Sequence, residues 1–143
     1  MDLLPPNNQE PETSEYVVLA RKYRPRDFST MVGQDALVRT LRNAFETGRL
    51  AHAFLLAGVR GVGKTTTARI VARALNCQED GRTTPAADPC GQCESCRAIS
   101  EDRSVDVLEI DAASHTGVDN IRDLLEGVKY APVSSRYKIY IID

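Results

Sequence analysis

Two groups of residues in this chain have the types and the spacing that bind ions. The first is the phosphate loop, Gly58-Val59-Arg60-Gly61-Val62-Gly63-Lys64-Thr65, which fits the pattern G-x-x-x-x-G-K-[ST]. Its glycines permit backbone conformations in which successive N–H groups face phosphate oxygens. In this pattern the Lys64 ammonium reaches the β and γ phosphates, and the Thr65 hydroxyl binds Mg²⁺. The loop predicts nucleotide binding; a glycine-rich turn before an ordinary helix is the alternative.

The second group consists of four cysteines with the spacing C-x12-C-x2-C-x2-C: Cys77, Cys90, Cys93 and Cys96. The tight Cys90–Cys93 turn lets two thiolates converge, and four sulfurs suit tetrahedral Zn²⁺. Iron–sulfur proteins also use C-x2-C-x2-C, but there a cysteine followed by proline is usual, whereas here Pro89 precedes the group. We predict a structural zinc site that pins a loop, with an iron–sulfur cluster or free thiols as alternatives.

The phosphate loop needs a strand before it and a helix after it. The apolar run 53–57 has the length and composition of a buried strand. From Lys64 to Leu75 a helix is predicted, with its apolar face formed by Ile70, Val71, Ala74 and Leu75. A second helix is predicted over 34–47, where Leu37, Leu41 and Phe45 share one face and Gly48 stands at the C-cap. Its beginning is expected close to the phosphate loop.

The second half of the chain reads as strand, helix, strand. Alternation over 105–111 predicts a strand with Val105, Val107 and Ile110 inward. Thr116 and Asp119 match a capping box. The helix that follows should bury Val118, Ile121, Leu125 and Val128, and end before Ala131-Pro132. The apolar run 137–142 predicts a strand that ends on the carboxylate of Asp143.

Composition sets limits on the class of protein. The 143 residues are 42% hydrophobic and 27% charged, with a formal net charge of -2, which argues against a wholly basic nucleic-acid surface. No run approaches the roughly 18 apolar residues of a membrane span, and no secretory signal begins the chain, so a cytosolic protein is expected. Residues 1–15 carry three prolines among acidic and amide residues, and a disordered tail is predicted there.

The segment 19–25 places a cluster of cations around Tyr23, and Pro25 favours an extended conformation at Arg24. Such a segment can lie against a base and its sugar. A solvated basic linker is the alternative.

Taken together, these stretches resemble the tau/gamma subunits of bacterial DNA polymerase III, the AAA+ ATPase motors of the sliding-clamp loader. The resemblance covers about residues 16–143 and is carried by 19–25, 32–34, the phosphate loop, the four cysteines, 109–114 and 130–132. It implies an α/β P-loop fold of three αβα layers around a parallel sheet, with a zinc-binding insert at about 77–96. It also implies a cytoplasmic bacterial protein whose partners are the other subunits of a hetero-pentameric loader, the sliding clamp and primed DNA.

The resemblance also implies roles for single residues. ATP or ADP would contact Tyr23, Arg24, Pro25, Val32 and Gly33 through its adenine and ribose. Its phosphates and Mg²⁺ would meet the phosphate loop, with Asp143 in the position of the Walker B aspartate. The full set for phosphate and Mg²⁺ is Gly58, Gly61, Val62, Gly63, Lys64, Thr65, Thr66 and Asp143. Zn²⁺ would be held by the four cysteines.

The family's pattern continues beyond Asp143 with a catalytic glutamate, sensor residues, an arginine finger, a lid and a collar. We therefore expect residues 16–143 to form a partial AAA+ domain that does not turn over ATP alone. The resemblance further implies a strand between the 53–57 and 138–142 runs that the sequence does not supply. A non-hydrolysing structural subunit and another AAA+ DNA motor are the competing classes. DNA contact is expected near Arg122, whose alternative role is pairing with Glu126.

Overall fold

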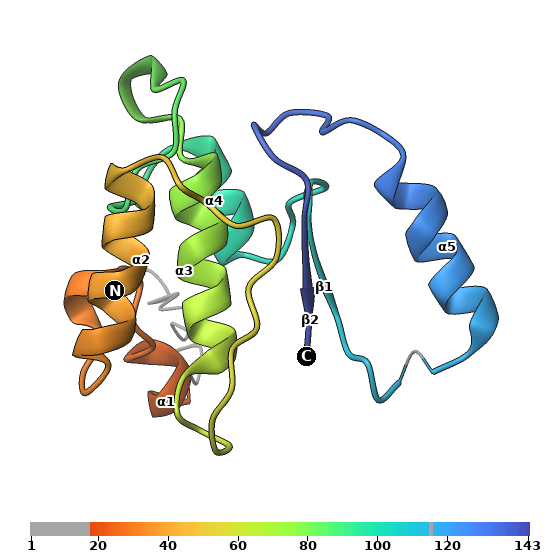
Figure 1. Cartoon of the computed structure of the whole chain (residues 1–143), viewed down its shortest axis with the longest axis horizontal. Helices are drawn as coiled ribbons and strands as arrows, with labels where there is room; N and C mark the ends of the chain where they lie inside the picture. Colours follow the sequence, from red (N-terminus) through yellow and green to blue (C-terminus); the bar gives the residue numbers. More distant parts are fainter. Residues whose placement is uncertain (1–17, 115) are drawn as a thin grey trace, which may run out of the picture.

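The computed structural model describes residues 18–114 and 116–143, so the tail predicted at 1–15 lies outside the described residues. Figure 1 shows a helical body joined to a pair of strands and a separate final helix. The elements in chain order are α1 (Leu19–Lys22), the 3-10 turn η1 (Phe28–Thr30), α2 (Asp35–Glu46), α3 (Lys64–Asn76), η2 (Glu79–Gly81), α4 (Glu94–Ser100), β1 (Val107–Ile110), α5 (Val118–Val128) and β2 (Ile139–Ile142).

The helical body is built around α3. Its residues Ile70, Val71 and Ala74 are buried against Leu41 and Phe45 of α2 and against Phe28 of η1, with Leu37 and Leu75 packed at the edge. The predicted apolar faces of both helices are therefore confirmed, as are their bounds within a residue or two. Gly48 takes φ +66° just after α2, as a C-cap glycine should.

The strands β1 and β2 form a parallel pair in which Val107 lies opposite Ile139 and Ile110 opposite Ile142. A small second core joins this pair to the helical body through Ala72 of α3, Ile99 of α4 and Ile141 of β2. A parallel pair needs a crossover connection, and α5 lies within that connection. The predicted α/β class with a parallel sheet is confirmed for these two strands.

The strand predicted over 53–57 is wrong for this structure. The segment has no strand conformation, and Phe54 and Leu55 are 41% and 95% exposed. A buried strand needs hydrogen-bonding neighbours, and within the described residues the sheet consists of β1 and β2 alone. An apolar composition favours burial, but it supplies no partner.

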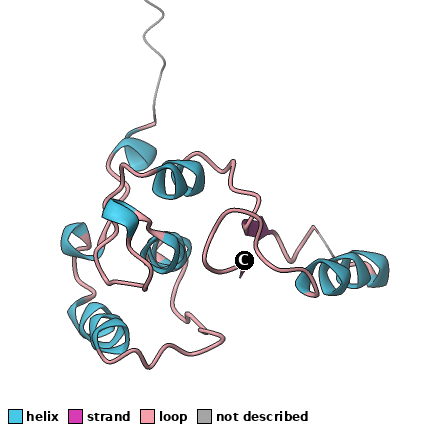
Figure 2. Cartoon of the chain, turned by 90° about the horizontal axis from the view of Figure 1, so that it is seen from above, coloured by secondary structure: helices cyan, strands magenta, loops and turns pink. Residues whose placement is uncertain are grey.

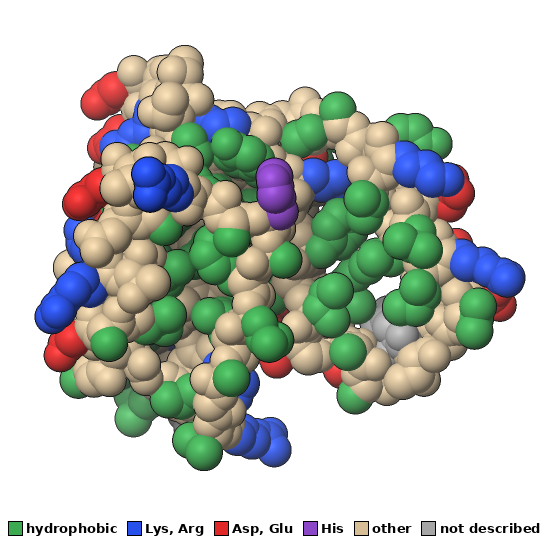
Figure 3. Space-filling view, in the orientation of Figure 1, with side chains coloured by type: hydrophobic (Ala, Val, Ile, Leu, Met, Phe, Trp, Pro, Cys, Tyr) green, Lys and Arg blue, Asp and Glu red, His purple; other side chains and the backbone are tan. Residues whose placement is uncertain are grey.

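Helix α5 also departs from expectation. It begins at Val118 with Gly117 as its N-cap and has no side-chain cap, so the capping box predicted at Thr116 is wrong. Val118, Ile121, Leu125 and Val128 share a face, but each is more than half exposed. Figures 1 and 2 both place α5 on the opposite side of the strands from the other helices. Figure 3 shows a hollow between the strands and α5, with hydrophobic side chains on both of its sides.

One further expectation, for Val105, and one alternative, for Arg122, also fail nearby. Val105 is 59% exposed, because the strand begins two residues later, at Val107. Arg122 lies 3.4 Å from the carboxylate of Asp119 rather than pairing with Glu126, which accepts a hydrogen bond from Lys129. Across the described residues, no helix combines the length and the apolarity that crossing a bilayer requires.

Candidate functional site

The phosphate loop leads directly into the N-terminus of α3. Gly61 and Gly63 have φ values of +84° and +104°, a left-handed region that residues with a Cβ seldom adopt. Gly63 is the N-cap of α3, and its carbonyl accepts the N–H of Thr67, which starts the helical ladder. The first N–H groups of this helix therefore have no intrahelical acceptor and can bind an anion.

Lys64 lies across this loop. Its Nζ donates to the carbonyl of Gly58 at 2.8 Å and to that of Val59 at 3.1 Å. A Cβ on Gly58 would come within 2.8 Å of the Val62 side chain, so the loop is too tight there for a larger residue. The ammonium is therefore held at the loop, next to the helix N-terminus, where it can meet phosphate oxygens.

Asp143 lies beside the same helix end. The hydroxyl of Thr65 donates to Asp143 Oδ2 at 2.8 Å, which joins the first turn of α3 to the end of β2. The backbone of Asp143 is fixed in turn, because its N–H donates to Ile110 and its carbonyl accepts from Ala112. A hydroxyl and a carboxylate at the mouth of a phosphate loop are the oxygen ligands that Mg²⁺ prefers.

Only some of the residues predicted to contact adenine lie close to the phosphate loop and α3. The Gln34 side chain donates to the carbonyl of Val62 at 3.4 Å, so the start of α2 does lie against the phosphate loop, as expected. Arg24 and Pro25 share a cavity with Thr66 of α3. Tyr23 and Val32, by contrast, are 72% and 92% exposed, and Gly33 follows with φ +75°.

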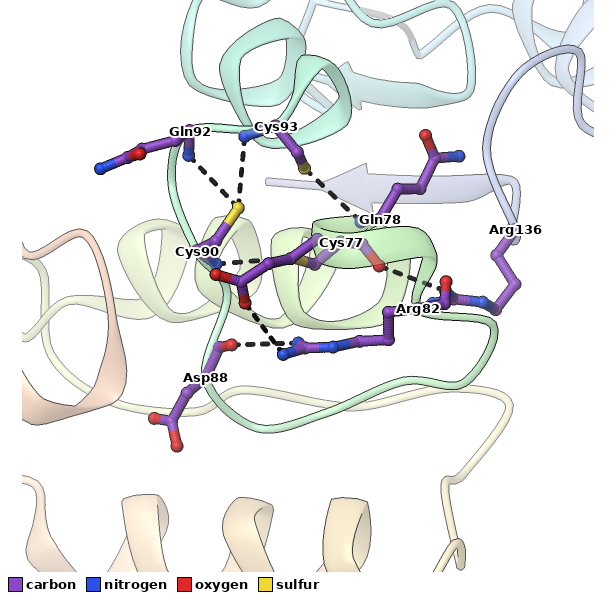
Figure 4. A network of polar contacts seen from close by, with 9 residues as sticks. Cys77, Gln78, Arg82, Asp88, Cys90, Gln92, Cys93 and Arg136 are labelled. Carbon is purple, nitrogen blue, oxygen red and sulfur yellow. Dashed lines mark hydrogen bonds and ion pairs between the residues drawn. The ribbon is translucent and has the colours of Figure 1, made fainter.

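The four cysteines converge from three segments into one cluster. Their sulfur atoms all lie within 4.8 Å of one another, although Cys77 follows α3 and Cys96 belongs to α4. The Gly91 φ of +72° makes the tight turn between Cys90 and Cys93. Figure 4 shows backbone N–H groups directed at the sulfurs, including those of Gln92 and Cys93, which donate to Cys90 at 3.4 and 3.2 Å.

Electrostatics within the cluster favour one thiolate. Burial raises the pKa of Cys93, but the backbone N–H groups of Gln78 and Cys96 outweigh burial and lower it to about 7. Burial raises the pKa of Cys96 strongly instead. A free group of four thiols in such a small volume would therefore resist full ionisation, which a bound cation favours.

Arg136 ties the cysteine cluster to the sheet, and no sequence pattern indicated it. Its guanidinium donates to the carbonyls of Leu75, Cys77 and Arg82, so it closes the C-terminal end of α3 (Figure 4). Next to it, Asn76 and Tyr137 exchange two hydrogen bonds of 2.8 and 2.9 Å. The segment before β2 is thereby fixed to the end of α3, while Asp143 after β2 contacts its beginning.

Asp106 is the second residue that sequence reasoning missed. It is 1% exposed, and its carboxylate accepts the backbone N–H groups of Val133, Ser134 and Ser135 at 2.7 to 2.8 Å. Burial raises the pKa of Asp106, but these three donors outweigh it and lower the pKa to about 2. A carboxylate just before a strand is common in loops, so its spacing alone gave no indication of this role.

A family model described as "DNA polymerase III, delta subunit" matches residues 33–143, which include the phosphate loop, the four cysteines and Asp143. The chain belongs to this family of DNA polymerase III subunits. It is similar to the DNA polymerase III subunit tau of Salmonella typhimurium and that of Escherichia coli K12, each 51% identical over 128 residues. These alignments cover 90% of this chain and 19% of each relative.

The DNA polymerase III subunit gamma/tau of Mycobacterium tuberculosis H37Rv is 49% identical over 129 residues, covering 89% of this chain and 22% of that relative. The resemblance to tau/gamma subunits is thus confirmed. The chain spans about a fifth of the length of these relatives.

Proposed function

We propose that this chain is the nucleotide-binding part of a clamp-loader motor, which binds ATP or ADP with Mg²⁺ in the bacterial cytoplasm. In the assembled protein, ATP binding and hydrolysis would drive loading of the sliding clamp onto primed DNA during replication. Its partners would be the other subunits of a hetero-pentamer, the clamp and the DNA. The observation that carries the proposal is the 2.8 Å contact between Thr65 and Asp143 at the mouth of the phosphate loop.

Each residue of the site would have a defined role. The N–H groups of the loop and of the first turn of α3 would bind the phosphates, together with the Lys64 ammonium. Thr65 and Asp143 would hold Mg²⁺, which neutralises charge on the β and γ phosphates. The adenine and ribose would lie toward Tyr23, Arg24, Pro25, Val32 and Gly33, on the side where Gln34 contacts the loop.

The test is calorimetric titration of ATP with Mg²⁺ into the full-length protein and its Lys64→Ala variant. Removing the ammonium should weaken ATP binding by at least about a hundredfold, since a charge-assisted contact to phosphate is lost from a site built around it. Lys129→Ala removes the same charge from the surface of α5 and should bind ATP as the parent does. Equal ATP affinity of the two variants would contradict the proposal.

A non-hydrolysing structural subunit is the competing function, and Asp143 separates the two. Asp143→Asn should retain nucleotide binding in the absence of Mg²⁺ but lose ATP turnover in the assembled loader with clamp and primed DNA. A loader in which this change leaves turnover intact would place hydrolysis in other subunits.

For the cysteine cluster we propose one structural Zn²⁺ held by Cys77, Cys90, Cys93 and Cys96. Zn–S bonds of about 2.3 Å in a tetrahedron separate the sulfurs by roughly 3.8 Å, which agrees with sulfurs that all lie within 4.8 Å of one another. An iron–sulfur cluster places several atoms between its thiolates and would hold them further apart. The ion would fasten the end of α3 to α4.

Elemental analysis of protein purified without chelator should find one zinc atom per chain. Cys93→Ser should release the metal, whereas Ser95→Ala, in the same turn of α4, should retain it. Iron in stoichiometric amount, or protein free of metal, would overturn the assignment.

A further inference from the structure

A cavity of about 380 Å³ lies between the segment 21–26, α3 and α4, and it is lined by arginines. It begins beside Thr66 of α3, continues along that helix, and reaches Gly91 of the cysteine turn. The guanidinium side chains come from all three elements, and we call this the arginine cavity. Its arginines are Arg21, Arg24, Arg26, Arg69, Arg73 and Arg97.

Most of these arginines form no ion pair among the residues that the structure describes. Arg69 is neutralised by Asp102 and Glu109, at 3.1 and 2.6 Å. Glu101 is the one carboxylate among the lining residues, and it already accepts a hydrogen bond from Arg103 at 2.5 Å. The other five arginines of the cavity form no ion pair with any residue in the ranges 18–114 and 116–143.

Arg73 shows that this cavity differs from a solvated basic surface. The residue is 6% exposed, and its Nη1 donates to the hydroxyl of Ser100 at 2.9 Å. Its Nε is buried and has no hydrogen-bond partner among the described residues. Burying a guanidinium charge is unfavourable, and an anion in the cavity that Arg73 lines would offset that cost through its opposite charge.

We propose that the arginine cavity binds a small anion with two or more linked phosphates, at a site distinct from the phosphate loop. Guanidinium groups bind phosphate through paired N–H donors, and several of them around one cavity suit an anion of high charge density. The cavity shares Thr66, Arg24 and Pro25 with the proposed nucleotide site, but Arg73 lies seven residues after Thr66, about 10 Å further along α3. The two sites therefore adjoin at these three residues, whereas the phosphate loop lies outside the cavity and Arg73 and Arg97 belong to the cavity alone.

Burial decides the class of ligand. A duplex backbone lies on a protein surface and would contact the exposed Arg21 and Arg97, but it would stay outside the cavity that Arg73 lines. A ligand that comes close to the 6% exposed Arg73 must enter the cavity, and about 380 Å³ is at the small end of the range for small-molecule sites. The structure thus favours a free phosphorylated anion over a nucleic acid.

The experiment is calorimetric titration of inorganic pyrophosphate into the full-length protein that carries Lys64→Ala, so that the phosphate loop is disabled. The proposal expects saturable binding of one pyrophosphate per chain. Adding Arg21→Gln and Arg97→Gln, two exposed positions unimportant for packing, should weaken that binding at least tenfold. Arg39→Gln with Arg49→Gln removes the same charge from surface positions outside the cavity and should leave the affinity unchanged.

A second variant tests the buried group. Arg73→Gln should weaken pyrophosphate further, while its circular dichroism and zinc content report whether the fold is intact. Two outcomes overturn the proposal: no saturable binding once Lys64 is replaced, or equal losses in the cavity variant and the matched surface variant. Because Lys64→Ala is the background throughout, failure here is distinguishable from failure of the proposed nucleotide site.

Discussion

Helices α3 and α5 have the same kind of sequence and very different surroundings. Each carries apolar residues at helical spacing, over 13 and 11 residues. In α3, Ile70, Ala72 and Ala74 are fully buried, while α5 has no buried residue. The difference shows that periodicity defines which face of a helix is apolar, whereas the neighbouring elements decide whether that face is covered.

What fastens each helix differs as well. The C-terminal end of α3 is held by Arg136, Asn76 and the cysteine cluster, and its beginning by Asp143. At the far end of α5, the Lys138 ammonium donates to the carbonyl of Gly127 at 2.7 Å. Polar contacts at both ends and apolar packing along the side make α3 the axis of the molecule, and α5 lacks both features.

The sharpest test of this contrast is to shorten one side chain in each helix. Ile70→Ala should lower the free energy of unfolding by roughly 3 to 4 kcal/mol, because it opens a cavity where Phe28 and Phe45 pack. Leu125→Ala should cost less than about 1 kcal/mol, since Leu125 is 55% exposed. Urea unfolding of both variants measures the difference. Similar losses would mean that α5 is covered in solution.

Asp106 should give the next largest effect, because it joins the start of β1 to the segment before β2. Asp106→Asn replaces an ionised acceptor of three N–H groups by a neutral amide, half of which is a donor. We expect a loss of roughly 2 to 3 kcal/mol in urea unfolding. Asp123→Asn, an exposed change of the same charge on α5, is the control and should alter stability little.

The dependence of the free energy of unfolding on acid pH should show the contribution of Asp106 as well, as a smaller effect than that of the substitution. The pKa of Asp106 is about 2 in the folded chain and about 3.9 when unfolded, so its contribution is complete above about pH 4. The contribution is lost as the pH falls toward 2. The parent protein should therefore lose stability more steeply over this interval than Asp106→Asn. Parallel curves for the two proteins would show that the three hydrogen bonds do not favour the ionised form.

Local pattern was enough to predict much of this molecule. The bounds of α2 and α3, the existence of the two strands and the convergence of the four cysteines follow from spacing, because each depends on residues close in sequence or on one strong motif. The parallel pairing of the strands was implied by the resemblance instead. The phosphate loop is an extreme case, since its glycines determine the backbone almost alone. Where residues close in sequence determine an element, the sequence is enough to predict that element.

The failures have a common physical cause, which is dependence on distant partners. The 53–57 run has strand composition, but no described segment pairs with it. Arg136 donates hydrogen bonds to backbone carbonyls, and Asp106 accepts them from backbone N–H groups, of segments distant in sequence. Every residue has such backbone groups, so the side-chain pattern does not reveal these contacts. The arginine cavity likewise combines residues from three elements whose packing the sequence did not reveal.

Gly127 provides the finest test, because it sits where α5 meets β2. A Cβ at this position would lie 3.0 Å from the hydroxyl oxygen of Tyr140, a contact that the neighbour must relieve by moving slightly. Alanine also raises helix propensity by up to about 1 kcal/mol. If α5 is held against β2, the two effects should nearly cancel, and Gly127→Ala should change stability by less than about 0.5 kcal/mol.

Removing the Tyr140 hydroxyl separates these two effects. In a Tyr140→Phe background the close contact is gone, so Gly127→Ala should then stabilise the protein by about 0.5 to 1 kcal/mol in urea unfolding. The buried Tyr140 oxygen has no hydrogen-bond partner among the described residues, so its loss should itself be mild. If Gly127→Ala stabilises the parent and the Tyr140→Phe protein equally, α5 does not pack against β2. The difference in packing between α3 and α5 is then greater than the structure indicates.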